Sequence, residues 1–123
     1  MRRFAILRHQ PGPSSTRPLH WDLMFECDDV LRTFACPREP TTGQSLSVEQ
    51  LEDHRLDYLD YEGPVSCGRG EVSRWDYGNF DVLEESPRHW LLDLRGHRCH
   101  GQVRFTAGDD HRWMLTFDEP VSD

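Results

Sequence analysis

Four residues in the first half of this chain have side chains suited to metal binding or acid–base chemistry: His9, His20, Asp22 and His54. His20 and Asp22 lie in residues 19–26 (LHWDLMFE), where apolar Leu, Trp, Leu and Phe occupy every second position. In a strand this alternation places His20 and Asp22 together on the face opposite the apolar residues. Both can then reach one divalent ion, and His9, at the end of an earlier strand, can supply a third ligand.

Plainer interpretations of the same residues stay open. A histidine and an aspartate two positions apart on a strand are more often an ordinary solvent-facing pair than metal ligands. His54 follows Glu52 and Asp53, and a histidine in such a place can simply be hydrogen-bonded at the end of an element. Spacing alone therefore does not decide between a site and a polar surface.

Two other metal sites can be considered from the sequence. Glu26, four residues after Asp22, gives a partial likeness to the metal-binding motif of cupin barrels, but the second half of that motif is missing. A candidate zinc group lies in an expected turn, although its spacing fits no common zinc site, and it consists of His97, Cys99 and His100. A solvated turn is the favoured interpretation there.

The elements that must position these residues are short strands. Strand patterns bounded by turn residues occur at residues 3–9, 19–26, 30–36, 71–75, 80–83, 90–95, 102–106 and 112–117. A tight turn is expected at 76–79 (DYGN), and a short helix at 47–53 (SVEQLED) with Ser47 as its N-cap. We therefore expect an all-β fold over residues 1–123 as one domain: a small closed barrel of about eight mostly antiparallel strands with one or two short helical turns.

Composition narrows the classes of function. The 123 residues carry a net charge of −8, which argues against a protein that coats nucleic acid non-specifically. All 14 cationic residues are arginines, so chemistry through a lysine, including ligation through a nucleotidyl-lysine, is excluded. The sequence has no export signal, no membrane span and no C-x-x-C pair among its four cysteines, which predicts a cytoplasmic protein with reduced thiols.

Several motifs occur in the order of a known family. They are Arg8-His9, LHWDLMFE (19–26), ACPR (35–38), EDHRLDYLDYEG (52–63), RWDYGNF (74–80) and LDLRG (92–96). This set resembles the 3′-phosphoesterase module of bacterial DNA ligase D over most of the chain. The resemblance implies a β-barrel with a manganese-type ion on its outer surface, held by His9, His20 and Asp22. It also implies that His54 and Tyr58 contact a phosphate.

The chain departs from the family pattern at several of these contacts. A family arginine on the metal-bearing strand face is Met24 here, a polar residue two before the first histidine is Leu7, and a basic strand residue falls near Ser45. The family lysine after proline corresponds to Arg38, which keeps the charge. Arg8 or Arg17 can bind substrate in place of the family arginine that is missing at position 24.

The resemblance implies a metal-dependent phosphoesterase that acts on DNA 3′ ends during end repair by non-homologous end joining. It would remove a 3′-phosphate or a 3′-ribonucleotide from DNA or DNA/RNA ends, working as a monomer beside a separate ligase or polymerase. In this mechanism Arg38 acts with His54 and Tyr58 to orient the phosphate. The alternative is a non-catalytic relative that binds a metal or a nucleic-acid end, and the changes at Met24, Leu7 and Ser45 favour it.

Overall fold

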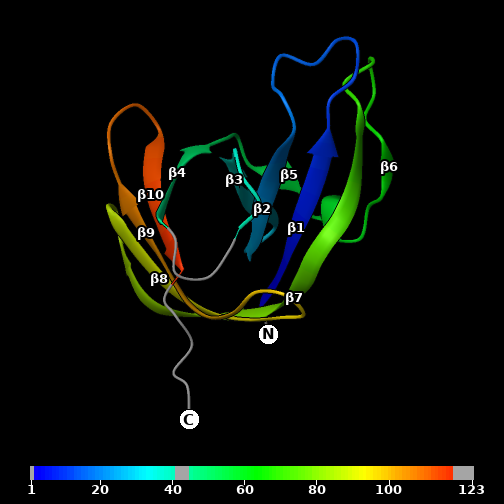
Figure 1. Cartoon of the computed structure of the whole chain (residues 1–123). Helices are drawn as coiled ribbons and strands as arrows, with labels where there is room; N and C mark the ends of the chain where they lie inside the picture. The colour runs from blue at the N-terminus through cyan, green and yellow to red at the C-terminus, as the bar shows by residue number, and fades with distance from the viewer. Residues whose placement is uncertain (1, 41–44, 118–123) are drawn as a thin grey trace.

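Eight strands close into a barrel in the computed structural model, which describes residues 2–40 and 45–117 (Figure 1). Neighbouring strands are antiparallel in the order β1-β2-β3-β4-β10-β9-β8-β7, and pairing of β7 with β1 completes the wall. The strands are β1 (Arg2–Gln10), β2 (His20–Cys27), β3 (Val30–Cys36), β4 (Ser45–Gln50), β7 (Glu71–Ser86), β8 (His89–Gly96), β9 (His100–Ala107) and β10 (Arg112–Phe117). The predicted all-β closed barrel is confirmed.

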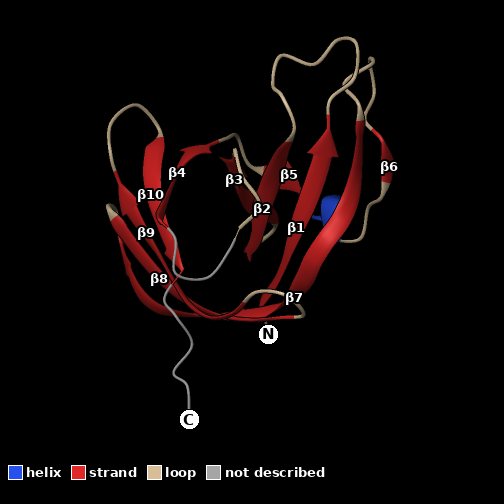
Figure 2. Cartoon of the chain, viewed as in Figure 1, coloured by secondary structure: helices blue, strands red, loops and turns tan. Residues whose placement is uncertain are grey.

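The remaining elements lie outside the barrel wall. They are β5 (His54–Arg55), the 3₁₀ turn η1 (Leu56–Leu59) and β6 (Gly63–Pro64), with β5 paired to β3 and β6 paired to β7 (Figure 2). No helix in the described part of the chain is long and apolar enough to cross a membrane.

Two local predictions were wrong. Residues 47–53 do not form a helix, because buried Leu46 and Val48 alternate with exposed Ser45 and Ser47, and this period of two fits β4 between β3 and β10. Residues 76–79 do not form a turn, because they continue β7 as one strand, paired to β1 on one side and, from Gly78, to β8 on the other. The Asp, Gly and Asn residues that suggested a turn lie within this strand.

The alternation predicted in β2 is confirmed. Trp21, Leu23 and Phe25 belong to the main hydrophobic core inside the barrel, whereas His20 and Asp22 lie on the opposite, outer face of the strand. Phe25 lies at the centre of this core, with the ring centroids of Phe34, Phe80, Trp90 and Phe105 between 5.3 and 6.4 Å from its own. Large aromatic side chains therefore fill the interior and leave chemistry to the outer face.

A second hydrophobic cluster lies on the outer face of β1, β2, β3 and β7. We call it the outer cluster, and its buried members are Ala5, Leu7, Met24, Leu31, Leu59 and Val72. The segment containing η1 and β6 covers these residues, with Leu56, Tyr58, Tyr61 and Val65 packed partly against them. The part of the outer face that carries Met24 and Leu7 is therefore covered by the chain rather than open to water.

Asp76 gives the RWDYGNF motif at residues 74–80 a structural role. Its side chain is 1% exposed, and its carboxylate accepts hydrogen bonds from the backbone N–H groups of Tyr77, His97, Arg98 and Cys99 at 2.7–3.1 Å. A β-carbon at Gly96 would lie 2.6 Å from Asp76 Oδ2, so a side chain there would displace this carboxylate. Asp76 thus holds the β8–β9 turn closed.

We expect Asp76→Asn to destabilise the protein by about 2–3 kcal/mol. An amide nitrogen cannot accept hydrogen bonds, so some of the buried N–H groups that now donate to the carboxylate would lose their acceptor. Urea unfolding measures the change. Asp81→Asn is the matched control on the same strand, since Asp81 is exposed and pairs only at the surface with Arg95. Equal unfolding midpoints for the two variants would show that Asp76 does not hold the turn.

Candidate metal centre

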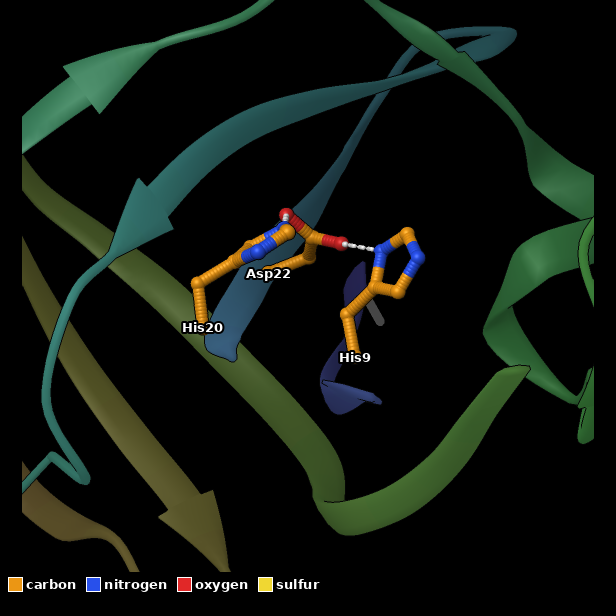
Figure 3. Close-up of side chains that lie close together, drawn as sticks. All are labelled: His9, His20 and Asp22. Carbon is orange, nitrogen blue, oxygen red and sulfur yellow. Dashed lines mark ion pairs between the residues drawn. The ribbon is translucent and has the colours of Figure 1, made fainter. Parts of the chain in front are cut away.

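The register between β1 and β2 brings His9, His20 and Asp22 together. His9 pairs with His20 across the two strands, and Leu7, two residues before His9, pairs with Asp22. Because the three side chains share the outer face, they converge (Figure 3). His9 Nδ1 lies 3.4 Å from Asp22 Oδ2, and His20 Nε2 lies 3.0 Å from Asp22 Oδ1. One ligand atom from each residue lies within 4.8 Å of the others, so the group can hold a metal ion.

Backbone carbonyls fix the orientation of both imidazole rings. His9 Nε2 lies 2.7 Å from the carbonyl oxygen of Arg69, and His20 Nδ1 lies 3.0 Å from that of Pro18. A carbonyl only accepts, so each of these nitrogens carries a proton, and in a neutral ring the nitrogen facing Asp22 is the bare one. Metal-binding histidines commonly show this arrangement.

The donor set suits a cation. Asp22 Oδ1 is buried and has no well-directed hydrogen bond within the described residues. With both rings neutral, two nitrogen lone pairs and a carboxylate face one small space and repel one another. A proton or a metal ion between them removes this repulsion. The three residues therefore fit a divalent ion that accepts nitrogen and oxygen ligands.

The pKa values at the centre reflect the same attraction. Burial by itself raises the pKa of Asp22, but the two imidazole rings of His20 and His9 beside the carboxylate, when protonated, outweigh it and lower that pKa to about 2. The Asp22 carboxylate raises the pKa of His9, because it attracts the proton of the charged ring, although burial acts in the opposite direction. The centre thus holds a carboxylate anion that favours positive charge beside it.

A hollow of about 180 Å³ opens in front of the three residues. Other side chains that line it are His54, Arg17 and Arg69. His54 Nδ1 lies 2.8 Å from the carbonyl oxygen of Glu52 and must donate to it, which leaves Nε2 free for a ligand. Arg17 forms two hydrogen bonds to Glu49, at 2.8 and 3.2 Å. The hollow therefore combines the metal group with one imidazole and two guanidinium groups.

Three of the predicted site residues lie elsewhere. Tyr58 contacts the ring of His54 but lines a neighbouring hollow rather than this one. Arg8 shares the barrel-facing side of β1 with Phe4 and Ile6, on the face away from His9. Arg38 is exposed and is not among the residues that line the hollow, so the roles of these arginines stay predictions.

The residues that replace the family's polar contacts are accounted for by packing. Met24 and Leu7 are each 1% exposed within the outer cluster. Ser45 is exposed on β4 and its hydroxyl lies 3.1 Å from that of Thr116. Among the described residues only His9, His20 and Asp22 gather as a metal-binding group, so the alternative groups around Glu26 and His97 are not assembled.

The sequence did not identify Arg69 as a residue of this site. Arg69 lies between Gly68 and Gly70, whose φ angles of +68° and +89° bend this loop against the β1–β2 loop. A β-carbon at Gly70 would lie 1.8 Å from the carbonyl oxygen of Gln10, so only glycine allows the contact. The glycines signalled a tight loop, but nothing in the sequence indicated which loop it would meet.

The sequence model of a known family matches residues 13–107, and that family is described as the DNA Ligase D 3′-phosphoesterase domain. The chain belongs to this family. His9 precedes the matched range, and His20, Asp22 and His54 lie within it.

Curated relatives of this 3′-phosphoesterase family member are much longer proteins. The multifunctional non-homologous end joining protein LigD of Pseudomonas aeruginosa is 34% identical over 126 residues, covering 90% of this chain. The LigD protein of Mycolicibacterium smegmatis is 33% identical and covers 91%, and the LigD DNA repair protein of Mycobacterium tuberculosis H37Rv is 31% identical and covers 90%. The chain spans 15–16% of the length of these relatives.

Proposed function

We propose that this chain is a metal-dependent phosphoesterase that acts on DNA 3′ ends, removing a 3′-phosphate or a 3′-ribonucleotide. The observation that carries the proposal is the convergence of His9, His20 and Asp22 beside His54 in one hollow. Membership in the 3′-phosphoesterase family and the LigD end-joining relatives support the choice of DNA ends as substrate. A divalent ion of the Mn²⁺ type, held by the three residues, would polarise a phosphoryl oxygen and lower the pKa of a bound water.

The other residues of the hollow have roles that follow from their positions. Water attacks phosphorus, the bond from phosphorus to the 3′-oxygen breaks, and that oxygen receives a proton. His54 is suited to donate this proton or to stabilise the developing charge from Nε2, because its Nδ1 is held by the Glu52 carbonyl. Arg17 and Arg69 supply positive charge for the phosphate, in place of the family guanidinium that Met24 has replaced.

The experiment is a turnover assay with purified protein, Mn²⁺ and a primer-template that ends in a 3′-phosphate or a single 3′-ribonucleotide. We expect release of inorganic phosphate from the first end or of a nucleoside 5′-monophosphate from the second, a new 3′-hydroxyl end in both cases, and complete loss of turnover in a chelator. No turnover on either substrate would remove the catalytic proposal. Addition of a separate end-joining ligase or polymerase tests the proposed partners.

The second candidate function is binding of a metal or a nucleic-acid end without turnover. Burial of Met24 and Leu7 in the outer cluster favours it, because no guanidinium can reach the hollow from those positions. Metal binding without hydrolysis would support this candidate. Metal titration and turnover together therefore separate the two functions from each other and from a purely structural barrel.

A further inference from the structure

A second hollow, of about 330 Å³, lies next to the first: Tyr58 lines it and contacts the ring of His54. Two half-buried tyrosines contribute to its lining, together with apolar and charged residues: Tyr58, Tyr61, Pro64, Val65, Arg55 and Asp57. None of these residues contributes to the metal group. The hollow therefore needs an explanation of its own.

A row of three rings connects the two hollows. His54 lines the metal-bearing hollow, and its ring centroid lies 5.6 Å from that of Tyr58, at an interplanar angle of 71°. Tyr58 in turn lies 5.7 Å from Tyr61 at 78°. The Tyr61 hydroxyl donates a hydrogen bond to the carbonyl oxygen of Pro64, which fixes that ring in place. The two tyrosines thus form a rigid aromatic corner, where a third flat ring can stack on one face and meet the edge of the other.

We propose that this second hollow binds the nucleobase of the nucleoside whose 3′-phosphate is attacked at the metal centre. The inference rests on the proposed function, because the sugar that links phosphate and base would lie beside His54, between the two hollows. Stacking on aromatic side chains accepts any base, since each base has a π-face. Stacking also supplies affinity without positive charge, which suits a chain with a net charge of −8.

The rim of the hollow suits the polar edge of a base. Arg55 and Asp57 are exposed there and offer a donor and an acceptor, whereas Pro64 and Val65 provide apolar wall. Because the rim is exposed to water, we expect the hollow to discriminate between a base and no base more than between different bases.

The test is a binding measurement that does not depend on turnover. Short primers ending in a non-hydrolysable 3′-methylenephosphonate, with either a normal terminal nucleotide or an abasic one, are titrated with protein and Mn²⁺ and followed by fluorescence anisotropy. We expect the wild-type protein to bind the base-containing end roughly tenfold more tightly than the abasic end. Equal affinity for both ends would overturn the inference without any variant.

Variants locate the effect. Tyr61→Leu is expected to reduce the tenfold preference to about twofold or less, because it removes the aromatic corner, while Tyr61→Phe keeps the ring and the preference. Tyr77→Leu is the matched control, since Tyr77 is an exposed tyrosine on β7 that does not line either hollow, and it should keep the wild-type preference. A preference that survives Tyr61→Leu would place the base elsewhere. If the preference behaves as expected but the turnover assay fails, the base site stands and the phosphoesterase proposal falls.

Discussion

Replacing His20 by alanine should abolish Mn²⁺ binding and reduce hydrolysis of a DNA 3′ end by roughly 10³-fold or more. His20 supplies one of three ligands that lie within 4.8 Å of one another, and two remaining ligands hold a divalent ion poorly. A metal ion that polarises a phosphoryl oxygen contributes several kcal/mol to the transition state, and about 4 kcal/mol corresponds to a 10³-fold rate. Asp22→Asn should behave alike, because it removes the anion that attracts the ion.

Thermal unfolding provides a measurement that does not require turnover. Mn²⁺ at about 100 times its dissociation constant should stabilise the wild-type protein by roughly 2.7 kcal/mol, and this shift should vanish in His20→Ala. His100→Ala, at an exposed histidine on β9, is the control and should keep the full shift. A His20→Ala protein that still responds to Mn²⁺ and still hydrolyses the end would show that the ion binds at other residues.

The barrel could be predicted from sequence because short strand patterns bounded by turn residues follow one another along the chain, and residues 19–26 alternate strictly. The pattern around Trp21 and Leu23 fixed both the strand and the face that carries His20, and the structure agrees. The error at Ser47 arose because a short run with a polar first residue fits a capped helix as well as a strand, and only pairing with β3 and β10 decides between them. Such pairing is a tertiary contact that local residues do not encode.

The candidate site was predictable only in part, for a similar reason. Side chains on adjacent strands, such as His9 and His20, can be placed together once both strands are recognised. Arg69 reaches the same hollow through a loop contact, and Arg8 is excluded from it by strand parity. The position of a loop depends on contacts with distant parts of the chain, so the local sequence does not predict it.

The replacement of the family arginine by Met24 was visible in the sequence, but its consequence was not. In the structure Met24 belongs to the outer cluster together with Leu7 and with Leu59 from η1. The two positions are diagonal neighbours, because Leu7 pairs with Asp22 and Met24 pairs with Ala5. The two apolar residues therefore belong together. We infer that a charged side chain at either position, with the other position still apolar, would be buried without a partner.

Restoring the family arginine should consequently harm the protein. We expect Met24→Arg to destabilise it by about 3–5 kcal/mol, because a guanidinium at a position 1% exposed would be buried among apolar side chains without a partner. Turnover should not rise. Met114→Arg is the matched control: Met114 is 45% exposed on β10, and its replacement should change stability by less than about 0.5 kcal/mol.

The second step adds a carboxylate at the diagonal position. In the double variant Leu7→Glu with Met24→Arg, the two charges can pair. Its loss of unfolding free energy should therefore be smaller, by roughly 1–3 kcal/mol, than the sum of the losses in the two single variants. Urea unfolding of the wild type, both single variants and the double variant completes the cycle. If Met24→Arg is as stable as the wild type and hydrolyses 3′ ends faster, then η1 opens readily over the outer cluster, and burial does not exclude a guanidinium from position 24.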